Sequence, residues 1–303
     1  MNIFSIGECM IELSLSKNGQ YNLSFAGDTA NTAIYLSRLG AKTSYITAIG
    51  KDNLSKKMIK YLKNEKIMTK NILINNIKTI GLYLIENNEK GEREFFYWRS
   101  DSAAKTLFND IDIIKFAKKL LNYDAVYLSG ITLSIYNTKD INKFYLMLKL
   151  LKKNNIKIYI DFNIRLKNWT NRYTADKIIK KFSLLCDIIF VSNDDLISLK
   201  IKNFKYFISH YSRNALVVYR KGDGLIKVYK NKKFLNFNLK FAKKVIDTTG
   251  CGDAFNAAFL INYMKQKNID DCIKVAHKLG KKVAFTKGAI IKKKKFIFKN
   301  YAI

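Results

Sequence analysis

The sequence predicts an α/β protein in which a doubly wound, mostly parallel β-sheet has helices on both faces and a small second β-sheet, called the lid below, lies beside it. Apolar, β-rich runs alternate with helical patterns along nearly the whole chain, which is typical of this architecture. Two segments interrupt the alternation and supply the smaller sheet. There is no internal repeat and no Ser/Gly-rich linker, so residues 1–303 are expected to form a single domain.

The hydrophobic pattern indicates buried strands separated by helices. Strands are expected in the runs NIFSIGE, TSYITAIG, DAVYLSG, KIYIDFN, DIIFVSN and ALVVYR, which are as continuously apolar as strands buried on both faces. Residues 53–65, 138–154 and 173–185 carry apolar residues at helical spacing. Proline is absent and glycine occurs only 14 times, so Gly, Asn and Asp must end the helices and form the turns.

Residues 12–26 and 79–100 are interpreted as the small lid sheet. The first segment alternates polar and apolar residues around KNGQ, and the second forms two strands joined by a turn from Asn87 to Gly91. Both lie outside the βα alternation of the rest of the chain. We therefore expect them to form a β layer beside the main sheet.

The second lid segment has two different faces. Because side chains alternate along a strand, Phe95, Tyr97 and Arg99 share one face, whereas Phe96 and Trp98 share the other. The first face could present a phenol and a guanidinium to a ligand. An ordinary cross-strand aromatic cluster is the alternative explanation of this stretch.

Length and composition indicate a globular protein that lacks a membrane-spanning signature. The chain has 303 residues, of which 48% are hydrophobic, which is enough for a large buried core. No run of about 18 uncharged apolar residues occurs, and the first residues lack the features of a signal peptide. We expect a cytoplasmic protein.

The cysteines and histidines do not form a metal-binding or catalytic pattern. The four cysteines are scattered: Cys9, Cys186, Cys251 and Cys272. No Cys-x-x-Cys pair occurs, so reduced thiols are expected. With only His210 and His277 in the chain, neither a histidine-based metal cluster nor a Ser-His-Asp triad is expected.

The net charge of +31 is unusual and raises the question of nucleic-acid binding. Of the 55 basic residues, 48 are Lys and seven are Arg, and the lysines are spread along the chain instead of forming one stripe with aromatic residues. Solvated lysine faces explain this distribution, and a nucleic-acid footprint is the alternative. A positive field would also attract an anionic small substrate.

Residues 247–255, DTTGCGDAF, carry the strongest chemical signal. Gly250 and Gly252 allow a tight turn, and the helix that follows directs unpaired N–H groups and its positive dipole end into that turn. An anion is expected there. Asp253, in the first helical turn, could cap the helix or accept a proton from a substrate hydroxyl. Phosphate-binding amides beside a carboxylate indicate a kinase, in which both bracket a transferred phosphoryl group.

This motif resembles the C-terminal signature of the ribokinase-like (PfkB-type) carbohydrate kinases. AGDTANTAIYLSRLG at 26–40 is similar to their N-terminal signature, and the two signatures lie about 220 residues apart in the family's order. Within the family, the chain looks like the 2-keto-3-deoxygluconate kinases over nearly its entire length. This narrower resemblance rests on GECMIELS, GDTANTA, IGLYLIE, GEREFFYWRSDSAA, YLSGITLSI, DFNIRLKNW and KGAII. The resemblance implies the ribokinase-like fold.

The resemblance also implies roles for individual residues. Asp253 would be the catalytic base, with Gly250, Cys251 and Gly252 forming the anion hole. The residues implied on the substrate side are Gly27, Asp28, Asn31, Tyr83, Tyr97, Arg99 and Arg165. The two arginines would serve the sugar acid's carboxylate and the phosphoryl region, and their use in a lysine-rich chain fits planar bidentate recognition.

Structural explanations of the same substrate-side residues stay open. Surface salt bridges could account for Arg99 and Arg165. A helix N-cap could account for Asp28, and a plain turn could account for Gly27.

The nucleotide side resembles the family more loosely. The residues implied there are Asn163, Asn193, Lys221, Gly222, Gly224, Thr248 and Gly288. The family's Asn-x-x-Glu motif has Leu196 at the Glu position, for which Asp194 or Asp195 could substitute. Its Gly-x-x-Gly turn has Lys221 at the first Gly, so we expect a turn of shifted geometry. Two family prolines are replaced by Phe162 and Leu166. These departures concern ATP affinity and rate more than reaction type.

The implied activity is ATP-dependent phosphorylation of the primary hydroxyl of 2-keto-3-deoxygluconate. ATP and Mg²⁺ are the implied cofactors, the metal ligands are unassigned, and the involvement of a monovalent cation is open. Asp253 needs no raised pKa for this role, because an ionised carboxylate can orient the hydroxyl and take its proton. The expected partners are the sugar acid, ATP and a second copy of the chain, with no nucleic acid and no membrane. The alternatives are a fructokinase or ribokinase, a decayed sugar- or nucleotide-binding protein, and a basic nucleic-acid-binding protein.

Overall fold

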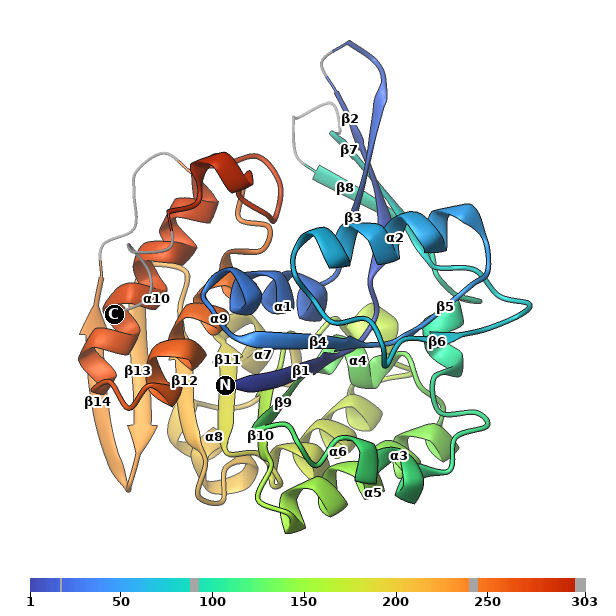
Figure 1. Ribbon diagram of the computed structural model, residues 1–303. Helices are drawn as coiled ribbons and strands as arrows, with labels where there is room; N and C mark the ends of the chain where they lie inside the picture. Colours follow the sequence, from blue (N-terminus) through green and yellow to red (C-terminus); the bar gives the residue numbers. More distant parts are fainter. Residues whose placement is uncertain (17, 88–92, 240–244, 298–303) are drawn as a thin grey trace.

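The computed structural model describes residues 1–16, 18–87, 93–239 and 245–297, and its centre is an eight-stranded sheet (Figure 1). In spatial order, the strands are β14 (Lys233–Asn238), β13 (Leu225–Lys230), β12 (Leu216–Arg220), β11 (Ile188–Ser192), β10 (Lys157–Asp161), β9 (Ala125–Ser129), β1 (Asn2–Ile6) and β4 (Lys42–Ile46). The pairs from β12 to β4 are parallel, and β13 and β14 extend the sheet antiparallel. The predicted mostly parallel sheet is confirmed.

Helices cover both faces of this sheet. One face packs against α1 (Asp28–Arg38), α9 (Cys251–Met264) and α10 (Ile269–Ala284). The other packs against α3 (Ile113–Lys119), α5 (Thr138–Lys153), α6 (Arg172–Ser183) and α8 (Phe204–Tyr211). Alternation along the strands separates the two cores: Val126 belongs to the second core and its neighbour Tyr127 to the first. The expected helices at 53–65, 138–154 and 173–185 are confirmed within one residue or two at each end.

Shorter elements complete the main body. They are α2 (Asn53–Asn64), α4 (Gly130–Ser134), α7 (Asn193–Ser198), and the two-stranded pair β5 (Ala48–Ile49) and β6 (Leu73–Ile74). The expected strand TSYITAIG is divided between β4 and β5. Three short 3₁₀ helices lie at Ala103–Thr106, Leu166–Asn168 and Lys293–Lys295.

A second, four-stranded sheet projects from the main body, as expected for the lid (Figure 1). Its strands, in spatial order, are β3 (Tyr21–Ala26), β2 (Met10–Leu15), β7 (Leu82–Asn87) and β8 (Arg93–Trp98). The predicted turn from Asn87 to Gly91 lies mostly outside the described residues, which resume at Arg93.

The two faces of the lid differ as the alternation predicts. Phe95 and Tyr97 stack with ring centroids 6.4 Å apart, and both rings pack near Tyr83 of the neighbouring strand. On the opposite face, Phe96 and Trp98 are 42% and 59% exposed. Phe95 and Tyr97 are also exposed, so the faces differ in ring stacking more than in exposure. Such an apolar surface is compatible with the expected pairing with a second copy, which stays a prediction.

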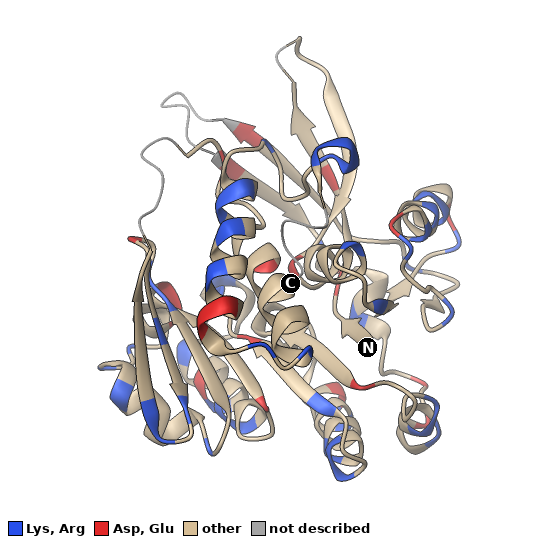
Figure 2. Cartoon of the chain, turned by 60° about the vertical axis from the view of Figure 1, so that its left-hand side comes forward, with Lys and Arg blue, Asp and Glu red and all other residues tan. Residues whose placement is uncertain are grey.

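The charged residues follow the pattern expected of solvated surfaces. Figure 2 shows Lys and Arg distributed over the outer helices and strands instead of lying in a single stripe. Within the part of the chain that the structure describes, no helix is long and apolar enough to cross a membrane.

Candidate active site

The carboxyl ends of the parallel strands bring several polar and charged side chains together. Glu8 follows β1, Asp161 ends β10, Asn193 follows β11, and Arg220 ends β12. The carboxyl ends of parallel strands share one edge of a sheet, which is where α/β proteins bind ligands. The start of α9 faces this edge, because Arg220 contacts Gly252 there. The site therefore combines loops from both halves of the chain.

The glycine turn before α9 has the geometry of an anion site. Gly250 has φ +76°, and a Cβ atom there would lie 2.7 Å from the Cβ and carbonyl oxygen of Ala289. Asp247 fixes the turn by accepting hydrogen bonds from the backbone N–H groups of Thr249 (3.0 Å) and Gly288 (2.5 Å). The predicted residues 248, 250 and 288 are thus held beside the N-terminus of α9, whose free N–H groups favour negative charge.

Asp253 lies in the first turn of α9 and is buried. Its Oδ2 atom accepts a hydrogen bond of 2.9 Å from Nδ2 of Asn31, so the two family signatures meet at this carboxylate. Burial raises the pKa of Asp253 well above the ordinary value, and repulsion from Asp28 raises it further. The pKa of Asp253 is raised because its side chain is removed from water, and the expectation that the reaction does not require a raised pKa stays a prediction.

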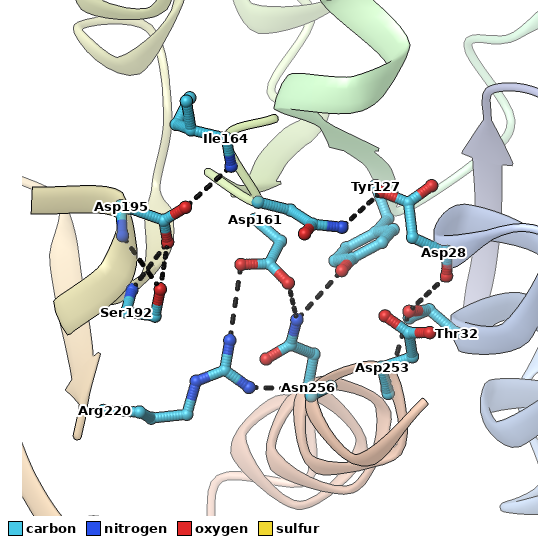
Figure 3. A network of polar contacts seen from close by, with 12 residues as sticks. Asp28, Thr32, Tyr127, Asp161, Ile164, Ser192, Asp195, Arg220, Asp253 and Asn256 are labelled. Atoms are coloured by element: carbon cyan, nitrogen blue, oxygen red, sulfur yellow. Dashed lines mark hydrogen bonds and ion pairs between the residues drawn. The ribbon is translucent and has the colours of Figure 1, made fainter. Parts of the chain in front are cut away.

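Asp161 is the centre of a buried network next to Asp253 (Figure 3). Asn256 of α9 donates through Nδ2 to Oδ2 of Asp161 (2.8 Å) and contacts the hydroxyl of Tyr127 (2.9 Å). Nη2 of Arg220 lies 3.3 Å from the other carboxylate oxygen of Asp161. Burial raises the pKa of Asp161 to about 6, although Arg220 lowers it. Carboxylates from two elements therefore share one poorly hydrated region.

The N-terminal signature forms the opposite wall. A Cβ atom on Gly27 would lie 2.1 Å from the carbonyl oxygen of Glu8, so close backbone approach requires glycine there, whereas a plain turn would not. Asp28 is the first residue of α1 instead of its N-cap. Its two oxygens accept from the N–H of Thr29 (2.8 Å) and from Nδ2 of Asn163 (2.8 Å). Asn163, expected on the nucleotide side, thus contacts a residue of the substrate side.

The predicted tyrosines and arginines converge under the lid. The Tyr83 and Tyr97 rings lie 5.8 Å apart, and both Arg99 and Arg165 lower the pKa of Tyr97, which burial raises. Arg99 is ion-paired with the buried carboxylate of Glu8, so its charge already has a partner. Arg165 is exposed, and within the described part of the chain its Nη1 donates only to the neighbouring carbonyl of Ile164 (3.1 Å). The Tyr83 hydroxyl donates to Glu12.

The Asn-x-x-Glu position is structural in this chain. Leu196 is buried in the core below the sheet edge. Asp195 is occupied by the backbone: its carboxylate accepts from Ser192 (2.7 Å) and from the N–H of Ile164 (2.6 Å). Asp194 is exposed. Of the two suggested substitutes for the family Glu, only Asp194 therefore has a carboxylate facing solvent.

The turn after β12 is formed as expected. The N–H of Gly224 donates to the carbonyl of Lys221 (3.1 Å), and Gly224 has φ +94°, a conformation that favours glycine. Lys221 is exposed and pairs with Asp223 (2.9 Å), while Gly222 has open space around it. Asn193 accepts from the Tyr219 hydroxyl (2.9 Å), which ties the β11 and β12 loops together.

Neither a resident metal cluster nor a reactive thiol is found at this edge. Across the described ranges 1–16, 18–87, 93–239 and 245–297, no group of three or more His, Cys, Asp or Glu side chains could hold a metal ion. Burial raises the pKa of Cys251 to about 12, with Asp247 adding to the effect. The thiol therefore stays protonated, and Cys251 can contribute its backbone N–H but not a thiolate.

Four residues of the site are missing from the sequence-based expectation: Glu8, Asp161, Arg220 and Asn256. Two signals could have identified three of them, Asp161, Asn256 and Arg220. Asp161 and Asn256 are polar positions within otherwise apolar buried runs, and Arg220 is one of only seven arginines. The partner of each residue is distant in sequence, so only the fold brings Asp161 and Asn256 together.

Comparison with known proteins identifies the family of this chain. The model of the pfkB family carbohydrate kinases matches residues 1–295. The 2-dehydro-3-deoxygluconokinase of Haemophilus influenzae is 34% identical over 95% of both chains, and that of Escherichia coli K12 is 31% identical over 94% of this chain and 96% of its own. A fructokinase from Xylella fastidiosa, solved with bound ATP, shares the fold with a TM-score of 0.82 at 17% identity, covering 99% and 95% of the two chains. A match over nearly the whole length shows that this chain belongs to the pfkB family of carbohydrate kinases.

Proposed function

We propose that this carbohydrate kinase transfers the γ-phosphoryl group of ATP to the primary hydroxyl of 2-keto-3-deoxygluconate, which gives the 6-phosphate. The proposal for the substrate rests chiefly on the basic and aromatic side chains under the lid. The relatives that are named 2-dehydro-3-deoxygluconokinase at 31–34% identity support it.

The observation that carries the substrate assignment is the concentration of cations around Tyr97. Arg99 and Arg165 both act on its pKa, and the Lys167 ammonium lies 4.8 Å from the centroid of its ring. Arg99 is balanced by Glu8, which leaves Arg165 and Lys167 as cations for a ligand's negative charge. A neutral sugar would leave this charge uncompensated, whereas a sugar carboxylate would pair with it.

In the proposed reaction, the carboxylate of Asp253 orients the sugar hydroxyl and accepts its proton as the new O–P bond forms. Asn31 holds that carboxylate at 2.9 Å. The amides of the Gly250–Gly252 turn stabilise the charge on the transferred phosphoryl group, as helix N-termini do for phosphates. The lid would exclude water and so limit ATP hydrolysis. Catalysis then consists mainly of positioning and charge stabilisation.

Mg²⁺ would enter with ATP. The described residues supply no group of three acidic or metal-ligating side chains, so phosphate oxygens and water would provide most of its ligands, which suits this ion. When bound, Mg²⁺ would neutralise part of the negative charge on the phosphates of ATP. Of the Asn-x-x-Glu region, only Asn193 and the exposed Asp194 are candidates to reach its water shell.

A coupled ADP-release assay tests this proposal. Wild-type protein with Mg-ATP is compared on 2-keto-3-deoxygluconate, fructose, ribose and no sugar, together with Arg165→Leu and, as a matched control, the exposed Arg213→Leu. We expect turnover with the keto-deoxy acid alone, and an increase of at least tenfold in its KM for Arg165→Leu but not for Arg213→Leu. Turnover only with fructose or ribose would refute the acid-specific site while leaving the kinase assignment. ATP binding without turnover on any sugar would identify a decayed enzyme.

A further inference from the structure

Arg220 joins three elements at the centre of the site. It is the last residue of β12, and its side chain is 17% exposed. Nη1 donates to the carbonyl oxygen of Gly252 at 3.1 Å, and Nη2 lies 3.3 Å from Oδ1 of Asp161. The guanidinium carbon also lies 5.1 Å from the ring centroid of Phe255. A single side chain therefore ties the first turn of α9 to the ends of β10 and β12.

The contacts use the shape of the guanidinium group. Nη1 and Nη2, two of its three nitrogens, contact acceptors on different elements, and one compact ammonium group cannot match this geometry. A Cβ atom on residue 252 would lie 3.3 Å from Nη1, so the absence of a side chain at Gly252 leaves room for the arginine. Gly252 follows the anion-binding turn and precedes Asp253. A movement of Arg220 would therefore be transmitted to both.

The charge of Arg220 also acts on the carboxylates of the site. It lowers the pKa of Asp161 and of Asp253, in opposition to burial and to their mutual repulsion. The other titratable groups that interact with Asp253 are Asp28 and Tyr35 of α1, Tyr127 of β9 and Cys251 of α9. All of these are acids, and ionisation of any of them would oppose ionisation of Asp253.

We propose that Arg220 is a positioning residue for phosphoryl transfer, which fixes the Gly250–Gly252 amides and Asp253 in their working geometry by clamping the start of α9 to Asp161. The proposal depends on the kinase reaction alone and not on the identity of the sugar. Misplacement of reacting groups by about 1 Å can lower a rate about 100-fold, so the clamp should affect kcat more than binding.

The test compares Arg220→Met and Arg220→Lys with the wild type and with Arg213→Met, on whichever sugar the wild type phosphorylates. For Arg220→Met we expect kcat about 100-fold lower, a KM for Mg-ATP within about threefold, and an acid limb of kcat displaced by about one unit to higher pH. Arg220→Lys keeps the positive charge but lacks the two separate donor nitrogens of the guanidinium group. We therefore expect its kcat to be about tenfold higher than that of Arg220→Met, with the acid limb of kcat at the wild-type pH. Arg213→Met should match the wild type.

Two results would overturn the proposal. One is an Arg220→Met enzyme with kcat within about threefold of the wild type. The other is an equal loss of kcat in Arg220→Met and Arg220→Lys, with the acid limb of kcat unchanged and the unfolding temperature lowered. That result would mean that Arg220 serves only the stability of the fold. An incorrect substrate assignment can be distinguished from these results, because the wild type would then not phosphorylate the proposed sugar acid. The variants are in that case compared on the sugar that the wild type does phosphorylate. A wild type inactive on every sugar has no transfer step for Arg220 to serve and overturns the proposal as well.

Discussion

Replacement of Gly250 by alanine tests the claim that the anion-binding turn requires glycine for two separate reasons. The first is backbone conformation, because φ is +76°. The second is space, because the added Cβ would lie 2.7 Å from Cβ and O of Ala289 and 2.8 Å from its Cα. Two of these three contacts are with backbone atoms, so a side-chain rotation cannot relieve them.

The glycines of this chain allow the two costs to be separated. Gly19 has the same φ of +76° with no atom within 4 Å, and Gly222 has open space without a left-handed φ. A left-handed conformation costs an alanine about 1–2 kcal/mol, and overpacking adds about 1–3 kcal/mol. We therefore expect a loss in unfolding free energy of about 1–2 kcal/mol for Gly19→Ala, near zero for Gly222→Ala, and about 2–5 kcal/mol for Gly250→Ala.

The assay is urea unfolding of the three variants together with steady-state kinetics of ADP release. Displacement of the turn by a few tenths of an ångström should lower kcat for Gly250→Ala at least tenfold, since the amides act only at the correct distance. Gly19→Ala should retain wild-type kcat, and Gly222→Ala serves as a control for stability alone. The reasoning is refuted if Gly250→Ala is as stable and as active as Gly19→Ala, because the contact with Ala289 would then carry no cost.

Three further predictions concern the buried charges. The pKa of Asp161 is raised to about 6, so its contribution to stability is fully present below its ordinary pKa of 3.8 and is lost as pH rises through 6. In Asp161→Asn, the decrease in unfolding free energy over this pH range should be smaller by about 3 kcal/mol. A pH dependence identical to that of the wild type would contradict this prediction. A double-mutant cycle of Glu8→Gln and Arg99→Leu should give a coupling of about 1–3 kcal/mol in unfolding free energy, whereas additive effects would mean that the pair is not formed. Leu196→Glu should destabilise the protein by more than about 3 kcal/mol without raising turnover, because the position is buried. Asp194→Glu, at an exposed position, is the control. A Leu196→Glu enzyme that is as stable as the wild type and faster would contradict this prediction.

The fold could be predicted from the sequence because its signals are local. Continuous apolar runs such as residues 188–191 predict strands covered on both faces, and the alternation at Phe95–Trp98 predicts a lid with two different faces. The turn before α9 was also predictable, since Gly250 and Gly252 flank the start of an apolar helix. Each of these inferences depends on neighbours in the chain.

The missing parts of the site depend on contacts between distant residues. The partner of Arg99 is Glu8 and that of Asp28 is Asn163, and neither pairing has a local signal. The raised pKa of Asp253 likewise results from burial and from Asp28, 225 positions earlier in the chain. Burial of a carboxylate at a sheet edge is a tertiary property, so a sequence pattern predicts the residue type but not its protonation.

The most direct test of the central claim is the rate of ADP release by Asp253→Asn with saturating Mg-ATP and sugar acid. Asparagine preserves the size of the side chain but removes the acceptor for the hydroxyl proton. We predict a loss in kcat of about 1,000-fold or more, with the Kd for ATP within about threefold of the wild type. Turnover within tenfold of the wild type would contradict the assignment of Asp253 as the base and, with it, the mechanism proposed for this site.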